Sequence, residues 1–279
     1  MKKTKLEDLI IGYGEIGRAL YKLFKRNVEV NNKIPQDLLK SNIIHLPHIY
    51  DKYNDKYSDY SKIKKARFMH VCYPYNQYFE ITLVNYIAKI NPYAVIIHST
   101  IPIGTTRRLN TSLIRNRIIF HSPVRGVHPH LKIAFTTFIK YLGVDPRTSK
   151  NVIKNVKKHL KQLGMKVKVL KSEETELGKL LSTFQYGRDI LLADELFKIC
   201  RKFKVDYNNV ILHFNKTYNE GYANLNLSKY SRSLLFPDIK KGFGGHCIVP
   251  NADLLKKAGV SNYYVNKIIK TGQKSKKRH

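Results

Sequence analysis

A glycine-rich turn stands near the start of the chain, between a short apolar run and a segment with helical periodicity. It matches G-x-G-x-x-G. In such a turn the first glycine permits the tight bend, the second lets backbone approach a pyrophosphate, and the third lets helix and strand pack closely. The positive end of the helix would face the phosphates. The pattern predicts a dinucleotide site made by Gly12, Tyr13, Gly14, Glu15, Ile16 and Gly17.

The next part of such a site departs from the usual pattern. Roughly 20 residues after the first glycine, NAD sites commonly have an acid that binds the ribose hydroxyls. This chain has Asn31, Asn32 and Lys33 there, and the nearest acid, Glu29, comes early. Asn32 and Lys33 are therefore the expected contacts to the ribose. Since a lysine would tolerate a 2′-phosphate, NAD and NADP both stay open.

Cys247 has the setting of a reactive cysteine. It follows the glycine-rich segment 242–246, where packing against a core is not expected. A thiolate in such a loop would be a nucleophile. Cys72 ends an apolar run and Cys200 lies in a helical pattern, so both are expected to be packing residues. Three scattered cysteines indicate neither a disulfide framework nor a metal site.

A second cluster with possible chemistry is the basic loop 125–130, which follows His121. His128 or His130 would act as a base near neutral pH, and Arg125 would bind a phosphate or carboxylate. The alternative is a basic surface loop. No carboxylate or cysteine stands at zinc-ligand spacing, so no metal is expected.

Alternating strands and helices must position these residues. The apolar patterns predict strands at 9–11, 28–30, 68–72, 94–98, 118–121, 138–142 and 167–170, and helices at 15–26, 77–90 and 149–163. The stretch before residue 65 is poorly patterned and is expected to be loop with some helix. Repeated βα units indicate an α/β fold, a Rossmann-like doubly wound parallel sheet with helices on both faces.

The pattern changes after residue 170. Residues 172–204 predict one long connecting helix and residues 206–218 another, followed by a polar stretch and the glycine-rich loop. We therefore expect two domains. Residues 1–170 would form the dinucleotide-binding Rossmann domain. Residues 171–279 would form a smaller helical domain with the Cys247 loop and a basic C-terminal tail.

Three segments in this order resemble the UDP-glucose/GDP-mannose dehydrogenase family. Residues 99–106, Ser-Thr-Ile-Pro-Ile-Gly-Thr-Thr, are similar to its S-T-x-P-x-G-T-T loop. Glu176 and Lys179 match its E-x-x-K on the helix that joins the first two domains. Residues 242–247 are similar to its G-F-G-G-x-C loop. Together they span most of the chain.

The resemblance implies roles for individual residues. Cys247 would be the nucleophile that attacks an aldehyde intermediate, forming a thiohemiacetal that a second hydride transfer oxidises to a thioester. Lys179 would stabilise the developing oxyanion. Thr100 would position a water or the substrate hydroxyl and contact the cofactor.

Departures from the family bear on catalysis. Val124 stands where the family usually has a glutamate, Thr183 where it has asparagine, and Asn251 where it has aspartate. The usual general base and its supporting acid are therefore replaced, and Thr183 and Asn251 become the candidate catalytic partners. The chain also ends about where the family's third, nucleotide-sugar-binding domain would develop.

Composition limits the remaining classes. The chain has 279 residues, of which 43% are hydrophobic, enough for a substantial core. No apolar run reaches the ~20 residues of a membrane span, so a cytoplasmic protein is expected. The net charge is +31, but lysine and arginine are spread along the chain. Only weak, salt-dependent binding to nucleic acid is expected.

The leading interpretation is an NAD(P)-dependent oxidoreductase that acts on an alcohol or aldehyde carbon of a sugar-type substrate, and the expected substrates are phosphorylated or nucleotide-linked sugars. A catalytically weakened dinucleotide or nucleotide-sugar binding protein is the first alternative. A basic nucleic-acid-associated protein is the second. By analogy with the family, a homodimer is expected.

Overall fold

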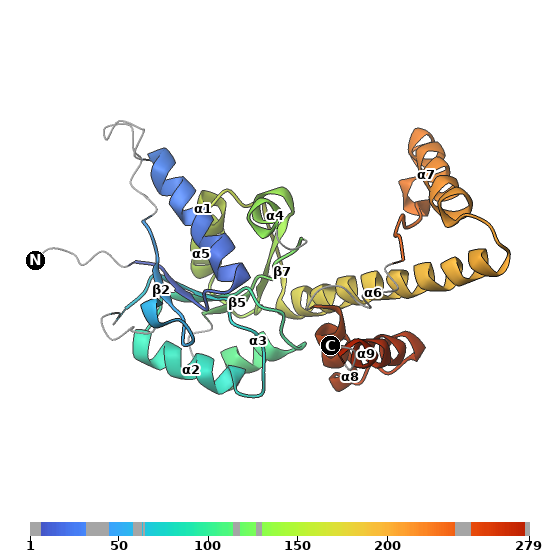
Figure 1. The fold of residues 1–279 in the computed structure, drawn as a ribbon. Coiled ribbons are helices and arrows are strands. Elements are labelled where there is room, and N and C mark those ends of the chain that lie inside the picture. Colours follow the sequence, from blue (N-terminus) through green and yellow to red (C-terminus); the bar gives the residue numbers. More distant parts are fainter. Residues whose placement is uncertain are drawn as a thin grey trace, which may run out of the picture. The chain divides into compact units, whose positions relative to one another are not determined.

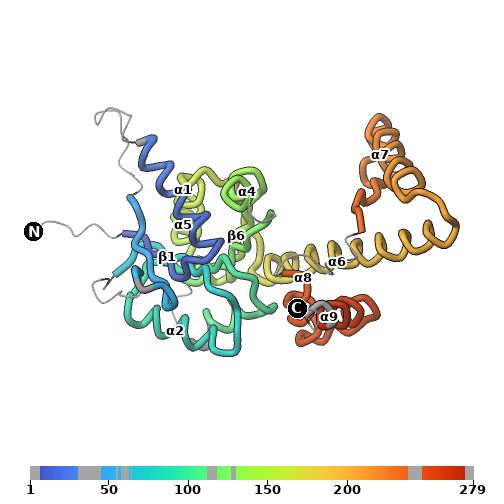
Figure 2. The backbone as a smooth tube through the Cα atoms, viewed as in Figure 1, coloured from blue at the N-terminus to red at the C-terminus, as the bar shows by residue number. Residues whose placement is uncertain are grey.

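The protein forms two compact units, residues 1–179 and residues 180–279, which are joined within one long helix. The computed structural model describes residues 7–31, 45–57, 63, 65–113, 118–126, 130–237 and 247–276. The predicted boundary at residue 170 lies just before this helix, whereas the units divide further along it. Figures 1 and 2 show the sheet-containing unit and the helical unit.

A seven-stranded sheet in the order β2-β1-β3-β4-β5-β6-β7 forms the centre of the first unit. All neighbouring strands are parallel except β5 and β6, which are antiparallel. The predicted mostly parallel α/β sheet is thereby confirmed. The strands are β1 (Leu9–Ile11), β2 (His48–Tyr50), β3 (Phe68–Val71), β4 (Ala94–Ile97), β5 (Ile119–His121), β6 (Lys140–Val144) and β7 (Val167–Lys171).

Helices cover both faces of this sheet (Figure 1). On one face lie α1 (Glu15–Asn31), α4 (Leu131–Thr137) and α5 (Lys150–Gln162), whose Phe24, Phe135 and Leu160 belong to one buried cluster. On the other lie α2 (Phe79–Ile90) and the π-helical turn η3 (Leu109–Leu113), which follows α3 (Thr105–Arg108). Alternate strand residues feed the two clusters, so the inner strands β1, β3, β4 and β5 are buried on both faces.

The second strand was predicted in the wrong place. Residues 28–30 continue α1, and β2 is His48–Tyr50. The reason is visible in the spacing of Ile16, Leu20, Phe24 and Val28, which keeps one helical face apolar for a further turn. The strand propensity of valine has a smaller effect on the local structure here than the continued packing of this helical face.

The second unit is helical. It contains most of α6 (Ser172–Lys202), then η4 (Asn208–His213), α7 (Phe214–Asn224), η5 (Ser228–Tyr230), α8 (Ile248–Lys257) and α9 (Tyr263–Lys276). The long predicted helix is confirmed, while α8 and α9 were not predicted. Gly187 lets α6 approach α8 and α9, because a Cβ there would lie 2.8 Å from Ile248 and 3.0 Å from Ile268. No helix in the described part of the chain is long and apolar enough to span a membrane.

Candidate cofactor and active site

The glycine turn joins β1 to α1 in a geometry that only glycine fits. Gly12 has φ +92°, and a Cβ on it would lie 2.7 Å from the backbone nitrogen of Tyr73. A Cβ on Gly17 would lie 2.0 Å from the carbonyl oxygen of Gly12. A Cβ on Gly14 meets no atom within 4 Å. Gly12 and Gly17 are thus required by the turn itself, whereas Gly14 leaves open space at the start of α1.

This turn stands where the order of the strands reverses. The chain runs from β1 to β2 on one side and returns to β3 on the other, so β1 and β3 are neighbours. Residues Cys72 and Tyr73, directly after β3, lie against Gly12. In open α/β sheets, ligands bind outside the carboxyl ends of the strands at such a reversal. The glycine turn therefore occupies the expected ligand-binding edge.

An acidic residue does follow the second strand, although the sequence pattern missed it. Asp51 comes directly after β2, and its carboxylate accepts hydrogen bonds from the backbone N–H groups of Tyr13, at 2.6 Å, and Tyr53, at 2.9 Å. It is thereby held beside the glycine turn. Recognising β2 at residues 48–50 would have revealed it, because the acid of a dinucleotide site stands at the end of the second strand.

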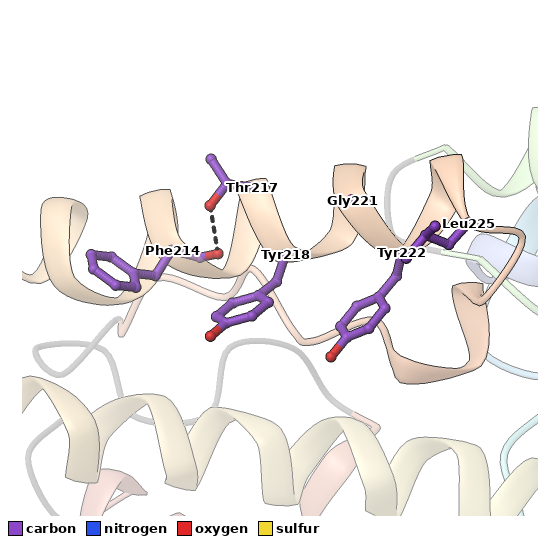
Figure 3. A pocket seen from close by; sticks show the side chains of 6 residues that line it. All are labelled: Phe214, Thr217, Tyr218, Gly221, Tyr222 and Leu225. Atoms are coloured by element: carbon purple, nitrogen blue, oxygen red, sulfur yellow. Dashed lines mark hydrogen bonds between the residues drawn. The ribbon is translucent and has the colours of Figure 1, made fainter.

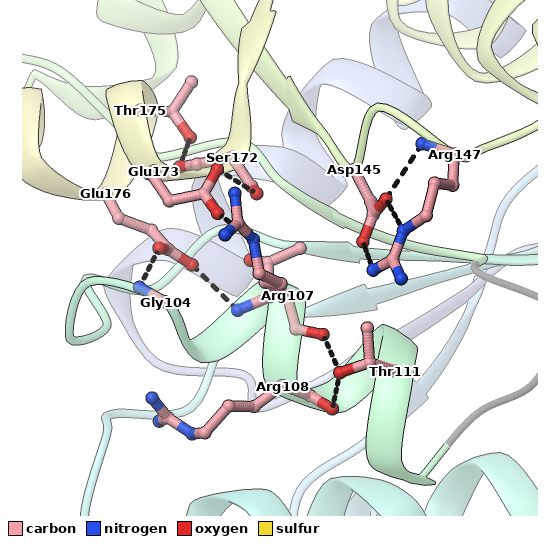
Figure 4. A network of polar contacts seen from close by, with 11 residues as sticks. Gly104, Arg107, Arg108, Thr111, Asp145, Arg147, Ser172, Glu173, Thr175 and Glu176 are labelled. Atoms are coloured by element: carbon pink, nitrogen blue, oxygen red, sulfur yellow. Dashed lines mark hydrogen bonds and ion pairs between the residues drawn. The ribbon is translucent and has the colours of Figure 1, made fainter.

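The loop after β4 carries Thr100, which is half-buried. Its far end is tied to α6 by Glu176, whose two carboxylate oxygens accept the N–H groups of Gly104, at 2.6 Å, and Thr106, at 2.8 Å (Figure 4). Glu176 thus caps the start of α3. Two of the family-like segments are therefore in direct contact: the loop 99–106 and the start of the E-x-x-K helix.

Burial raises the pKa of Glu176 to about 7, although the N–H groups of Thr106 and Gly104 oppose this. Lys179 lies one helical turn later and is half-buried. The Glu176 carboxylate faces the loop N–H groups, so Glu176 is not part of a solvated helix surface. Lys179 therefore lies on α6 three residues after Glu176, the residue that holds this loop.

His121 is excluded as a base near neutral pH. It is fully buried in β5, with Nδ1 at 2.8 Å from Thr175 Oγ1 and Nε2 at 3.2 Å from the carbonyl oxygen of Ser99. Burial lowers its pKa to about 3. Its contacts instead connect β5 with α6 and with the loop after β4.

The neighbouring basic loop is only partly described. The guanidinium of Arg125 lies over the rings of Phe138 and Tyr141, 5.4 Å from each centroid. His130 is exposed just before α4. Val124, in the place of the family's glutamate, is 6% exposed. His128 lies outside the described residues, as do Asn32, Lys33 and residues 242–246.

In the helical unit, three of the predicted catalytic residues are brought together. The side-chain amide of Asn251 donates to Thr183 Oγ1 at 3.1 Å. The backbone N–H of Asn251 donates to the carbonyl oxygen of Cys247, which precedes α8. Cys247 is half-buried. The two residues that depart from the family, Thr183 and Asn251, thus retain a hydrogen bond between α6 and α8 but supply no carboxylate.

Comparison with known proteins defines the fold. No protein-family model matches the sequence, and no curated protein is detectably similar to it. The UDP-D-ManNAc dehydrogenase of Pyrococcus horikoshii superposes with a TM-score of 0.70 at 16% identity, over 97% of this chain and 69% of that one.

Two further solved structures have the same arrangement. The 3-hydroxyisobutyrate dehydrogenase of Mycobacterium tuberculosis has a TM-score of 0.65 at 12% identity, covering 95% of this chain and 92% of that one. Prephenate dehydrogenase of A. aeolicus, solved with hydroxyphenyl propionate and NAD+, has a TM-score of 0.52 at 14% identity, covering 100% and 90%. At these identities the likeness shows the fold, a Rossmann-like unit followed by helices.

Proposed function

We propose that this protein is an NAD(P)-dependent oxidoreductase that acts on an alcohol or aldehyde carbon of a sugar-type substrate. The observation that carries the proposal is the glycine turn at the strand reversal, with Gly14 open and Asp51 held beside it. The backbone at this turn can approach a pyrophosphate, and the start of α1 supplies N–H donors for it. The dehydrogenase fold of the compared structures supports the same conclusion.

Of the two cofactors, NAD fits this site better than NADP. The Asp51 carboxylate uses one lone pair on each oxygen for the N–H groups of Tyr13 and Tyr53. Each oxygen keeps acceptor capacity for a ribose hydroxyl. A 2′-phosphate at the same place would meet a negative charge, which disfavours NADP.

The proposed chemistry uses Cys247, Lys179 and Thr100 beside the nicotinamide, which would accept hydride from the substrate. Lys179 would provide positive charge where an oxyanion develops, and Thr100 would orient the reacting hydroxyl or a water. Cys247 would hold an aldehyde-level substrate covalently.

The altered partners favour a restricted reaction. Val124 offers no proton acceptor, and Thr183 and Asn251 form a neutral pair. We therefore propose a single hydride transfer or a substrate other than the family's usual one. Since the base is replaced by a buried apolar residue, a protein that binds the dinucleotide or nucleotide sugar with little turnover is the second candidate.

Calorimetric titration with NADH tests the cofactor site through Gly14→Val. Because a Cβ at this position meets nothing and Gly14 needs no left-handed backbone, the variant should fold normally. Its side chain would fill the space through which the pyrophosphate approaches, so NADH affinity should fall at least ~100-fold.

Gly221→Val in α7 is the matched control, since a Cβ there also meets nothing within 4 Å. It should bind NADH as the unaltered protein does. Titration with NADPH should give an affinity at least ~10-fold lower than NADH, and equal affinities would contradict the role of Asp51. Unchanged NADH binding by folded Gly14→Val would refute the site.

A further inference from the structure

A chain of three hydrogen-bonded histidines lies inside the sheet-containing unit and has no part in the proposed chemistry. His70 of β3 is at the centre, with Nδ1 at 2.9 Å from His98 Nε2 and Nε2 at 3.0 Å from His159 Nε2. His98 follows β4, and His159 belongs to α5. All three side chains are at most 1% exposed. The chain therefore links two neighbouring strands to the helix that covers them.

The partners at its ends fix the direction of the hydrogen bonds. His98 Nδ1 is 3.1 Å from the carbonyl oxygen of Ser122, which can only accept, so this nitrogen carries a hydrogen. In the neutral chain, His98 Nε2 must then accept from His70 Nδ1. His70 Nε2 must in turn accept from His159 Nε2. This single set of tautomers satisfies every internal contact.

The same assignment leaves a lone pair on His159 Nδ1. That nitrogen has no hydrogen-bond partner and stands 3.8 Å from Asp8 Oδ2. Asp8 already accepts from Arg67, at 3.0 and 2.8 Å, and from the backbone N–H of Phe68. A first proton can bind at His159 Nδ1 without breaking the chain. A second proton on the chain must break a hydrogen bond, since every other ring nitrogen already donates or accepts.

The surroundings oppose charge on these rings. Phe24 of α1 lies against His70 and His159, Phe68 stacks on His159 at 4.2 Å, and Phe135 of α4 lies against His98. Lys140 of β6, which donates to the carbonyl oxygens of Ser122 and Pro123, faces the His98 end. The Cys72 thiol interacts electrostatically with Lys140, and His121 interacts electrostatically with His98.

We propose that this histidine chain is an acid-sensitive latch. While the chain is neutral, its hydrogen bonds hold α5 against the sheet and connect the segments that follow β4 and β5. Protonation breaks these bonds and releases α5 from its face of the sheet. The trigger is a proton on His70 or His98, where every ring nitrogen already donates or accepts a hydrogen bond.

The sign of the effect follows from linkage. Burial lowers the pKa of His70, His98 and His159 well below the ordinary value, with further lowering from His159 on His70, from Lys140 on His98, and from Arg67 on His159. Below about pH 6.5 the unfolded chain binds protons that the folded chain excludes. Stability is therefore present above this pH and is lost as the pH falls below it. For each unit that the pH falls once the unfolded histidines are charged, exclusion of protons from His70 and His98 contributes a rise of about 100-fold to the unfolding constant, and exclusion from His159 by burial and Arg67 contributes a further rise of about 10-fold.

The latch acts on the edge that carries the proposed cofactor site. His98 immediately precedes the loop that begins at Ser99, and Ser122 precedes Pro123 and Val124. Loss of NADH affinity at acid pH would rest on the proposed function. Release of α5 at acid pH does not depend on the proposed function, so hydrogen exchange in α5 and NADH binding are measured separately.

Hydrogen exchange from pH 7.5 to pH 5, corrected for intrinsic rates, tests the proposal. Protection should fall in α5 before it falls in α2, which packs on the opposite face of the sheet. Simultaneous loss in both helices, or loss in α2 first, would overturn the latch.

Urea unfolding of His159→Phe at several pH values gives a second readout. Phe suits the aromatic surroundings, and the variant excludes one proton fewer, so its unfolding constant should rise about 10-fold less per pH unit than that of the unaltered protein. His213→Asn, at an exposed histidine, should leave the pH dependence unchanged. Equal pH dependence in His159→Phe would contradict the proposal.

If His159→Phe does not fold, proton uptake by the unaltered protein decides the question. Calorimetric unfolding near pH 5.5, in buffers of different ionisation enthalpy, should show uptake of at least two protons. Uptake of less than one would overturn the proposal.

Discussion

At the residue scale, the three thiols differ in their surroundings rather than in their sequence neighbours alone. Burial raises the pKa of Cys72 to about 12, only partly offset by Lys140. Cys200 is 3% exposed within α6. Cys247 is half-buried at the start of α8. Since thiolate fraction and access control alkylation, only Cys247 is set up to react.

We expect iodoacetamide to modify Cys247 first at pH 7.5, with Cys72 and Cys200 reacting at least ~10-fold more slowly. Peptide mass spectrometry over time measures the three rates. Cys247→Ser should remove the fast phase and leave the slow ones. NADH should slow the modification of Cys247 if the proposed active site is right. Faster modification of Cys72 or Cys200 would contradict this picture.

At the element scale, the contact between α6 and the loop before α3 rests on one carboxylate. Glu176 is fully buried and accepts the backbone N–H groups of Gly104 and Thr106. These groups lie at the start of α3, where backbone N–H groups have no carbonyl partner within the helix. Arg107 and Glu173 form an ion pair at the same junction (Figure 4). The loop that carries Thr100 is thus fixed at its far end by the first turns of α6.

The raised pKa of Glu176 predicts a pH-dependent stability contribution. Because the folded pKa, about 7, exceeds the unfolded value, the folded state binds more protons between about pH 4.5 and 7. This contribution is lost as the pH rises, by roughly 3 kcal/mol in total. In Glu176→Gln it is absent, so the stability advantage of the unaltered protein over the variant should shrink from pH 5 to pH 8.

Urea unfolding at each pH measures this difference, and histidine effects cancel because both proteins contain them. Glu195→Gln, at an exposed position of the same helix, should give no pH-dependent difference. A constant difference between the unaltered protein and Glu176→Gln would show that this carboxyl titrates normally.

At the scale of the whole molecule, the helical unit exposes much apolar surface. In α6, Leu192 and Ile199 are 47% and 52% exposed, and Leu225 after α7 is 66% exposed. A hollow on α7 is lined by Phe214, Thr217, Tyr218, Gly221, Tyr222 and Leu225, with the two tyrosine rings side by side (Figure 3). Contiguous exposed apolar surface commonly marks a protein interface.

We therefore predict a homodimer formed through the helical unit, measured by light scattering at micromolar concentration. Ile199→Glu combined with Leu225→Glu would bury charge in the interface, so the dissociation constant should rise at least ~100-fold. Asn151→Glu at an exposed position of α5 is the control for added negative charge. If light scattering shows that the unaltered protein is a monomer, this prediction is wrong.

Local spacing in the sequence was enough to identify the glycine turn, most strands and the long helix. Gly12, Gly14 and Gly17 need only their neighbours to define a strand–turn–helix, and the apolar residues of β3 and β4 form short uninterrupted runs. These signals are local because each arises from backbone conformation or from one buried face. The same reasoning failed at residues 28–30, where helix and strand signals overlapped.

Only the tertiary structure decided which distant residues meet. Asp51 reaches Tyr13 through the pairing of β2 with β1, and Glu176 reaches Gly104 through the packing of α6. His159 meets His70 across the interface between α5 and the sheet. Such contacts depend on strand register and helix packing, which a single sequence does not encode in its spacing. The glycine turn is therefore readable from the sequence, whereas its acidic partner and the histidine chain are products of the fold.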